Sequence, residues 1–145
     1  MNAFATEFSA RTATPASRVE TFIRNNSFEH PTLVVDRDAV ARQYGALKAG
    51  LGRASIHYAV KANPAKEIIE TLVGLGSHFD AASRGEIELC LSQGAHPEHI
   101  SFGNTIKKAR DIAWAHSVGI TLFSVDAEEE IAKVAEHAPG AQVYI

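Results

Sequence analysis

Five short apolar segments recur along the chain from residue 56 onward, at a nearly constant interval of about 21 residues. They are IHYAVKA (56–62), SHFDAAS (77–83), ISFGN (100–104), ITLFSVD (120–126) and AQVYI (141–145). Each segment has the length of a β-strand, and a fixed period of this size indicates a repeated structural unit. We therefore predict one strand in each segment.

Between these segments, apolar residues return at the three- and four-residue spacing of an amphipathic helix. The predicted stripes are Ile68, Ile69, Leu72 and Val73; Ile87, Cys90 and Leu91; Ile106, Ala109, Ile112 and Ala113; and Ile131, Val134, Ala135 and Ala138. A glycine follows each stripe where a helix commonly ends, at Gly76, Gly94, Gly119 and Gly140. Strand and helix alternate four times before a fifth strand, which predicts parallel βαβ units.

Capping residues predict where several of these helices begin. Pro64 is expected at a first helical position. Ser83 and Glu86 have the spacing of a capping box. Asn104 and Asp126 follow later strands, and we interpret both as helix caps rather than catalytic groups.

The part of the chain before the repeat is predicted to contain one further strand and helix. PTLVVD (31–36) has the pattern of a strand, and residues 37–51 form a helix pattern with Val40, Tyr44 and Leu47 on one face. We divide the chain into a leader with a short helix (1–30) and the repeating domain (31–145). The first 17 residues lack the continuous apolar core of a secretory signal.

Two folds contain parallel βαβ units, the open doubly wound sheet and the (β/α)8 barrel. No Gly-x-Gly-x-x-Gly motif follows the first strand and no P-loop is present, which argues against a nucleotide-binding open sheet. The even spacing favours the α/β barrel. Such a barrel typically needs about 250 residues, so these 145 residues are predicted to be the N-terminal part of an incomplete TIM barrel.

Composition and charge exclude several classes of function. The net charge of −3 and the pI of about 6.1 do not predict binding to nucleic acid or an anionic membrane. The densest basic stretch, KKAR (107–110), is interpreted as a solvated helix face. Cys90 is the only cysteine, which excludes an intrachain disulfide and is typical of the cytoplasm. Its helical spacing predicts core packing, and no apolar run is long enough to span a membrane.

Polar residues at the predicted strand ends are the candidates for chemistry, because barrel active sites lie at the C-terminal ends of the strands. Lys61 is the most informative, since a lysine that ends a largely buried strand is costly to keep charged. Burial disfavours the charged form of an amine, and a neutral amine can form a Schiff base with a carbonyl group. Alternatively, Lys61 is a structural lysine paired with a carboxylate. Asp80, one strand later, either orients Lys61 or caps a loop.

No metal site is predicted, because the histidines show no ligand spacing. His96 and His99 are three residues apart, but Pro97 places them in a predicted loop. The nucleophile elbow Gly-x-Ser-x-Gly is also absent from the sequence.

Four stretches together resemble the N-terminal half of the fold-type III pyridoxal-phosphate decarboxylases, and within them the ornithine decarboxylase group. They are YAVKANP, GLGSHFDAASRGEIELCL, ISFGNTIKK and LFSVDAEEE, and the resemblance covers roughly residues 30–145. It implies a barrel of the alanine racemase and ornithine decarboxylase type. The remaining barrel strands and the C-terminal β domain of that family are not contained in these 145 residues.

The resemblance also implies roles for four residues. Lys61 would hold pyridoxal 5'-phosphate as a Schiff base, and Asp80 would lie near that lysine and the cofactor. Ala59 would line the face of the cofactor, and Glu86 would help to fix the lysine while capping its own helix. The implied reaction is decarboxylation of L-ornithine to putrescine in polyamine biosynthesis, by a cytoplasmic homodimer with a shared active site. The 145 residues alone are expected to be inactive.

Three alternatives stay open at this point. The first is a lysine/ornithine or diaminopimelate decarboxylase, and the second is a non-catalytic regulatory homologue that binds pyridoxal phosphate. The third sets the resemblance aside and interprets Lys61 as the Schiff-base lysine of an aldolase. The presence of Lys61, Asp80 and Glu86 together favours the decarboxylase.

Overall fold

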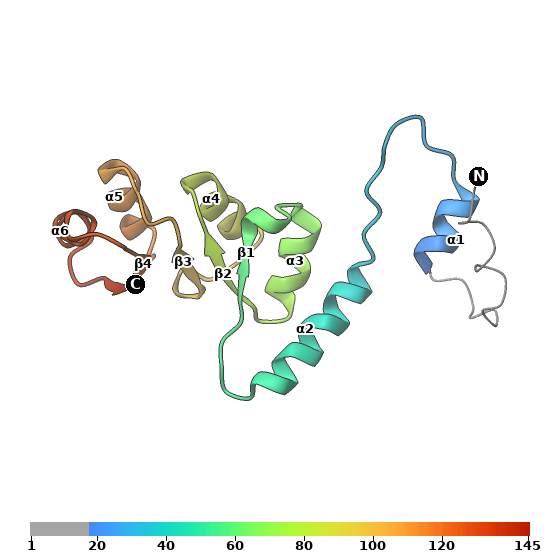
Figure 1. Cartoon of the computed structure of the whole chain (residues 1–145), viewed down its shortest axis with the longest axis horizontal. Helices are drawn as coiled ribbons and strands as arrows, with labels where there is room; N and C mark the ends of the chain where they lie inside the picture. The colour runs from blue at the N-terminus through green and yellow to red at the C-terminus, as the bar shows by residue number, and fades with distance from the viewer. Residues whose placement is uncertain (1–17) are drawn as a thin grey trace, which may run out of the picture. The chain divides into compact units, whose positions relative to one another are not determined.

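The computed structural model describes residues 18–145, which belong to two compact units divided between Asp36 and Arg37 (Figure 1). The described part of the first unit contains helix α1 (Arg18–Asn25) and an irregular segment that reaches Asp36. The rings of Phe22 and Phe28 lie 5.9 Å apart in this unit. The prediction for residues 1–17 lies outside the described residues.

The strand predicted at residues 31–36 is wrong. This segment has no regular secondary structure, and the side chain of Leu33 is 81% exposed. A β-strand requires a neighbouring strand to accept and donate its backbone hydrogen bonds. No strand in the described part of the chain pairs with this segment, so its apolar residues alone do not form one.

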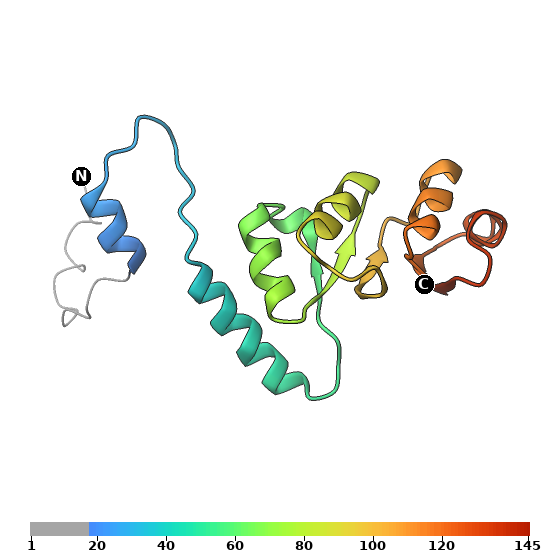
Figure 2. The ribbon, with the colours of Figure 1, turned by 180° about the vertical axis from the view of Figure 1, so that it is seen from behind.

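The second unit alternates strands and helices along the chain. Its elements are α2 (Arg37–Leu51), β1 (His57–Ala59), the 3-10 turn η1 (Val60–Ala62), α3 (Lys66–Gly74), β2 (His78–Ala81), α4 (Arg84–Ser92), the 3-10 turn η2 (Pro97–His99), β3 (Ile100–Phe102), α5 (Ala109–Ser117), β4 (Leu122–Ser124), α6 (Glu128–His137) and β5 (Gln142–Tyr144). Figures 1 and 2 show from opposite sides how α3 to α6 follow the strands along the sheet.

The five strands form one parallel sheet in the order β1-β2-β3-β4-β5. A doubly wound sheet reverses its strand order at a switch point, whereas these strands follow the chain without reversal. The predicted α/β fold class is therefore confirmed, with the strand arrangement of the first part of a (β/α)8 barrel. The predicted helix at residues 37–51 is also confirmed as α2.

The register of the sheet reproduces the period seen in the sequence. Tyr58 lies opposite Phe79, and Phe79 lies opposite Ile100. Ser101 then lies opposite Leu122 on the next pair of strands. Because side chains alternate between the two faces of a strand, this register places every second residue of each strand on a common face.

The helix-covered face of the sheet forms the hydrophobic core. Phe79, Ile100 and Phe123 are buried there against residues of the helices, among them Ile69 and Ile87. The stripes predicted for α3 and α4 are confirmed at the buried residues Ile68, Ile69, Leu72, Ile87 and Cys90. Parallel strands with helices on one face are expected to bury apolar side chains in this way.

The stripes predicted for the last two helices are partly wrong. Ile106 is 73% exposed and precedes α5, and Ala115 is buried in α5 where Ala113 was expected. In α6, Ile131 is exposed while its neighbour Glu130 is buried. Helix α5 begins at Ala109, after Ile106, and the buried residues of the two helices are Ile112 and Ala115 in α5 and Glu130 and Val134 in α6, so the side that faces the sheet differs from the predicted stripe.

The capping box at the start of α4 is confirmed. Ser83 is the N-cap, and its hydroxyl accepts a hydrogen bond from the backbone N–H of Glu86 at 3.3 Å. The carboxylate of Glu86 in turn accepts a hydrogen bond from the backbone N–H of Ala82 at 2.7 Å. Two backbone donors that the helix leaves unpaired are thereby satisfied.

The other three predicted helix starts are wrong. Pro64 precedes α3, whose N-cap is Ala65, because the Asn63 side chain forms a turn by accepting the Ala65 N–H at 3.1 Å. Asn104 and Asp126 do not cap α5 and α6, whose N-caps are Lys108 and Ala127 without side-chain bonds. The predicted glycine ends are confirmed, because Gly76, Gly94, Gly119 and Gly140 have φ values of +73°, +89°, +98° and +82°.

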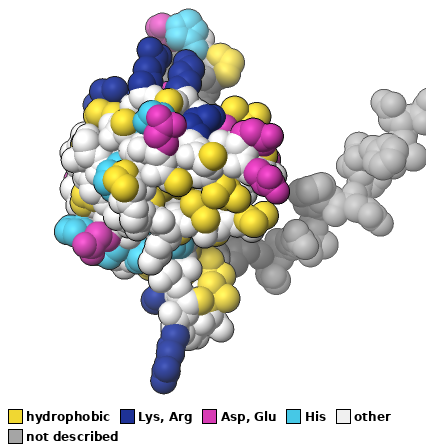
Figure 3. Space-filling view, turned by 90° about the vertical axis from the view of Figure 1, so that its left-hand side faces the viewer, with side chains coloured by type: hydrophobic (Ala, Val, Ile, Leu, Met, Phe, Trp, Pro, Cys, Tyr) yellow, Lys and Arg dark blue, Asp and Glu magenta, His cyan; other side chains and the backbone are white. Residues whose placement is uncertain are grey.

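The outer edge of the sheet at β5 is open within the described residues. Val143 and Ile145 are exposed, although β5 continues the register of the buried strands. Figure 3 shows the molecule from the side of α5 and α6, where hydrophobic side chains lie exposed among charged ones. The apolar core therefore lies between the helices and the preceding strands.

Cys90 is fully buried on the sheet-facing side of α4, which confirms its predicted place in the core. Burial raises the pKa of its thiol from 9.0 to about 12, and the negative charge of Glu86 adds to this effect. Because the thiolate is the reactive form of cysteine, this thiol is chemically inert in the folded chain.

We predict that Cys90 makes the folded state less stable at alkaline pH. The unfolded thiol loses its proton near pH 9, whereas the folded thiol keeps it to about pH 12, so its stabilising contribution is complete below pH 9 and is lost above it. Urea unfolding should show that stability falls more steeply between about pH 9 and pH 11 in the wild type than in Cys90→Ala. Equal slopes for the two proteins would contradict the prediction.

Candidate functional site

The face of the sheet turned away from the helices carries a cavity of about 360 Å³. We call this face of the sheet the inner face. The cavity is lined by one residue from each strand, namely His57, Asp80, Ser101, Leu122 and Tyr144. The register explains this grouping, because Asp80 lies opposite Ser101 and Ser101 lies opposite Leu122. The period of the sequence thus gathers polar groups that lie far apart along the chain.

The carboxylate of Asp80 is the centre of the polar contacts on the inner face. The Ser101 hydroxyl donates a hydrogen bond to Asp80 Oδ1 at 2.9 Å, and the Tyr144 hydroxyl lies 3.3 Å from the same oxygen. Within residues 18–145, Asp80 Oδ2 accepts no hydrogen bond. Both contacts therefore reach the same carboxylate oxygen, Oδ1.

Gly103 leaves the space that the Asp80 carboxylate occupies. A Cβ atom added at Gly103 would lie 1.9 Å from Asp80 Oδ1 and 2.6 Å from Oδ2. Any side chain at this position would therefore displace the carboxylate. Sequence reasoning missed Ser101, Gly103 and Tyr144 as partners of Asp80. The 21-residue period could have indicated Ser101, since it places Ser101 one strand beyond Asp80.

The environment of the inner face changes the titration of Tyr144. Burial raises the pKa of its phenol above 10.0, and the negative charge of Asp80 raises it further. Hydrogen bonds to Ser101 and Ser124 act in the opposite direction. Tyr144 therefore remains a neutral hydrogen-bond donor toward Asp80 at neutral pH.

Lys61 lies in η1, the 3-10 turn that directly follows β1, and it is exposed. The prediction of a buried lysine is therefore wrong for this chain. Strand β1 ends at Ala59, so the backbone has already left the sheet where Lys61 begins. An exposed primary amine at the carboxyl end of a strand is open to reaction with a carbonyl compound from solvent.

The other three predicted site residues lie on β1 (Ala59), on β2 (Asp80) and in the first turn of α4 (Glu86). Ala59 lies opposite Asp80 in the register of β1 and β2. Glu86 holds the turn after β2 through the Ala82 N–H. No hydrogen bond or ion pair joins Lys61 to Asp80 or Glu86 in the described part of the chain. The part of Glu86 in capping α4 is confirmed, and its part in fixing Lys61 stays a prediction.

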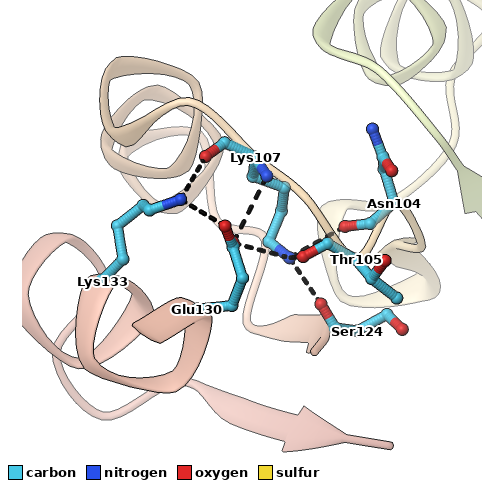
Figure 4. Close-up of polar contacts among 6 residues, drawn as sticks. All are labelled: Asn104, Thr105, Lys107, Ser124, Glu130 and Lys133. Carbon is cyan, nitrogen blue, oxygen red and sulfur yellow. Dashed lines mark hydrogen bonds and ion pairs between the residues drawn. The ribbon is translucent and has the colours of Figure 1, made fainter. Parts of the chain in front are cut away.

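A second lysine, Lys107, connects the ends of β3 and β4 through hydrogen bonds. The prediction made for it from the sequence is wrong. The KKAR stretch was predicted to be solvated, but the side chain of Lys107 has no exposed area. Its ammonium donates hydrogen bonds to the carbonyl oxygens of Asn104 at 2.8 Å, Thr105 at 3.3 Å and Ser124 at 2.5 Å (Figure 4). The loop after β3 is thereby fastened to the end of β4.

The charge of Lys107 is balanced by α6. Glu130 Oε2 lies 3.9 Å from the Lys107 ammonium and accepts the Lys107 backbone N–H at 3.3 Å. Lys133 donates to Glu130 Oε1 and to the Lys107 carbonyl (Figure 4). Burial lowers the pKa of Lys107, and the attraction of Glu130 opposes that shift. A buried charge with a full set of partners is the arrangement that proteins tolerate.

We predict that Lys107→Met destabilises the chain by about 3 kcal/mol, because it leaves three carbonyl groups without their donor and removes one of the two positive charges beside the buried Glu130. Urea unfolding measures the change. Lys108→Met, at the exposed neighbouring lysine, is the matched control and should change stability by less than about 0.5 kcal/mol. Adding Glu130→Leu to Lys107→Met should restore part of the loss. A loss below about 1 kcal/mol for Lys107→Met would contradict the prediction.

Three histidines stack across the start of the first three strands. The ring centroids of His57 and His78 are 4.8 Å apart, and those of His78 and His99 are 4.1 Å apart. Burial and the neighbouring positive charges of His99, His57 and Lys48 lower the pKa of His78.

Among residues 18–145, no three His, Cys, Asp or Glu side chains are placed to hold a metal ion. None of the helices in that range is long and apolar enough to cross a membrane.

Comparison with known proteins assigns the family. The model of the pyridoxal-dependent decarboxylases, pyridoxal binding domain, matches residues 37–145. The chain therefore belongs to the pyridoxal-dependent decarboxylase family, of which it contains pyridoxal-binding-domain sequence. The resemblance stated from the sequence motifs is confirmed, and the aldolase alternative is set aside.

Several of the similar proteins are named as decarboxylases of basic amino acids. The chain is 40% identical over 115 residues to the lysine/ornithine decarboxylase of Selenomonas ruminantium, covering 79% of this chain and 29% of the relative. It is 36% identical over 117 residues to the chloroplastic ornithine decarboxylase of Nicotiana glauca, covering 81% and 27%. The chain spans less than a third of the length of these curated relatives.

A solved structure with the same arrangement is the lysine/ornithine decarboxylase from Vibrio vulnificus complexed with putrescine. It superposes on this chain with a TM-score of 0.79 at 32% identity, covering 88% of this chain and 36% of that one. The fold of the second unit is thus shared with a decarboxylase of known structure.

Proposed function

We propose that this sequence provides the cofactor-attachment part of a pyridoxal-phosphate-dependent decarboxylase of basic amino acids. The observation that carries the proposal is the pairing of β1 with β2. The exposed amine of Lys61 follows Ala59, and Ala59 lies opposite Asp80, whose Oδ2 has no hydrogen-bond partner in the described chain. Membership of a pyridoxal-dependent family supports the same assignment.

The residues present fit the cofactor. The Lys61 Nζ is accessible from solvent and can condense with the cofactor's aldehyde carbon, with release of water. The small Ala59 side chain leaves room for a flat ring beside β1. Asp80 supplies a negative charge, which would favour the protonated form of a nearby nitrogen atom of the cofactor. When bound, pyridoxal phosphate supplies the electron sink for the electron pair released as the substrate carboxylate leaves as CO₂.

The proposed substrate is L-ornithine, with putrescine as the product and polyamine biosynthesis as the purpose. The similarity to an ornithine decarboxylase supports this choice. The higher identity to a lysine/ornithine decarboxylase supports the alternative of an enzyme that accepts both amino acids. We also propose that the protein is a cytoplasmic homodimer with a shared active site. This part of the proposal is based on the family resemblance.

We predict that pyridoxal phosphate followed by borohydride labels Lys61 selectively. Peptide mapping by mass spectrometry should find the reduced adduct on Lys61 in preference to the exposed Lys66 and Lys108. Lys61→Arg should abolish this adduct. The matched control is Lys66→Arg, at the exposed first residue of α3, and it should leave the adduct on Lys61 unchanged. Label spread evenly over the surface lysines would contradict the proposal.

The reaction itself is tested by CO₂ release in the protein that carries this sequence. Lys61→Arg should lower the rate of CO₂ release from ornithine at least about 100-fold, because arginine cannot form the covalent link. Competition between ornithine and lysine as substrates then measures the ratio of the two kcat/KM values. CO₂ release from neither amino acid would contradict the proposed reaction and favour the non-catalytic homologue.

A further inference from the structure

Two hydroxyl groups from different strands approach one oxygen of Asp80. Ser101 lies on β3 and is 2% exposed, and its hydroxyl is 2.9 Å from Asp80 Oδ1 and 3.3 Å from the Phe79 carbonyl. A serine hydroxyl has one proton, and the shorter distance and the negative charge favour donation to Asp80. Tyr144 on β5 approaches the same Oδ1 at 3.3 Å.

The orientation of the Asp80 carboxylate depends on these contacts, because its other close neighbour, Gly103, offers no hydrogen-bonding side chain. The terminal torsion of an aspartate is broad and has no strong preference of its own. Gly103 leaves the space for the carboxylate but supplies no polar side chain to select one of its two oxygens. The two hydroxyls thus determine which oxygen faces the sheet and which faces the cavity.

We propose that Ser101 and Tyr144 are positioning residues that hold Asp80 by Oδ1 and leave Oδ2 available to the cofactor at Lys61. This inference rests on the proposed function and assigns roles to two residues that the family resemblance did not imply. Both act through Asp80 and neither is placed to react. The hydroxyl groups, and not the bulk of the side chains, carry the effect.

The Asp80–Tyr144 contact can be measured in the chain without any cofactor. Tyr144 is one of three tyrosines, and its ring can be followed by NMR during a pH titration. Asp80→Asn should shift the titration of Tyr144 to lower pH, because it removes a negative charge that raises the pKa of the phenol. Tyr58, whose pKa is raised by burial and not by Asp80, should titrate as before and serves as the internal control.

The positioning role is tested by the rate at which pyridoxal phosphate and borohydride label Lys61. Ser101→Ala and Tyr144→Phe should each slow this labelling about 3- to 10-fold, because Asp80 is then held less firmly in place. The matched controls are Ser92→Ala, at an exposed serine of α4, and Tyr44→Phe, on α2, and both should label at the wild-type rate. Ser101→Thr keeps the hydroxyl, and its added methyl can enter the cavity, so this variant should label like the wild type.

The possible outcomes separate this inference from the proposed function. If the wild type labels Lys61 and both hydroxyl-deleting variants label equally fast, the positioning role is overturned while the proposed function stands. If Ser101→Thr is as slow as Ser101→Ala, the effect is structural and the inference is likewise overturned. If the wild type does not label Lys61, both proposals fail, and the Tyr144 titration still decides whether the contact exists.

Discussion

Parallel pairing of five strands in chain order is the constraint on which the rest of this structure depends. Each strand is offset from the next by about one 21-residue unit, so equivalent positions of successive units become neighbours. One set of alternating side chains packs under the helices, and the other set lines the inner face. The hydrophobic effect acts on the first set, and in doing so it brings Asp80, Ser101 and Tyr144 together.

Charged groups serve two different purposes at the carboxyl ends of these strands. Lys107 is buried with three carbonyl acceptors and Glu130, and it fastens the loop after β3 to β4. Lys61 is exposed in a turn that leaves the sheet, where it makes no polar contact within residues 18–145. A lysine with all its donors used is a structural group, whereas an accessible amine can still form a covalent bond.

The family assignment and the geometry around Asp80 are independent observations. The family model matches sequence, whereas the contacts around Asp80 come from the register of the sheet. Asp80 is held at one oxygen by groups from β3 and β5, each about a repeat or more away in the sequence. A site built from several strands in this way is a general property of barrel enzymes, and it allows a partner residue to change without altering the fold.

The sequence by itself determined the five strands of the sheet, the parallel α/β class and the family. It did so because the period of 21 residues and the helical stripes are local patterns, and because the two motifs that contain Lys61 and Asp80 are each contiguous in the sequence. Only the tertiary structure decided that residues 31–36 form no strand, that Lys61 is exposed and Lys107 buried, and that Ser101 and Tyr144 meet Asp80. Each of these depends on which distant backbone or side chain lies next to a residue, and no local pattern of apolar and polar positions contains that information.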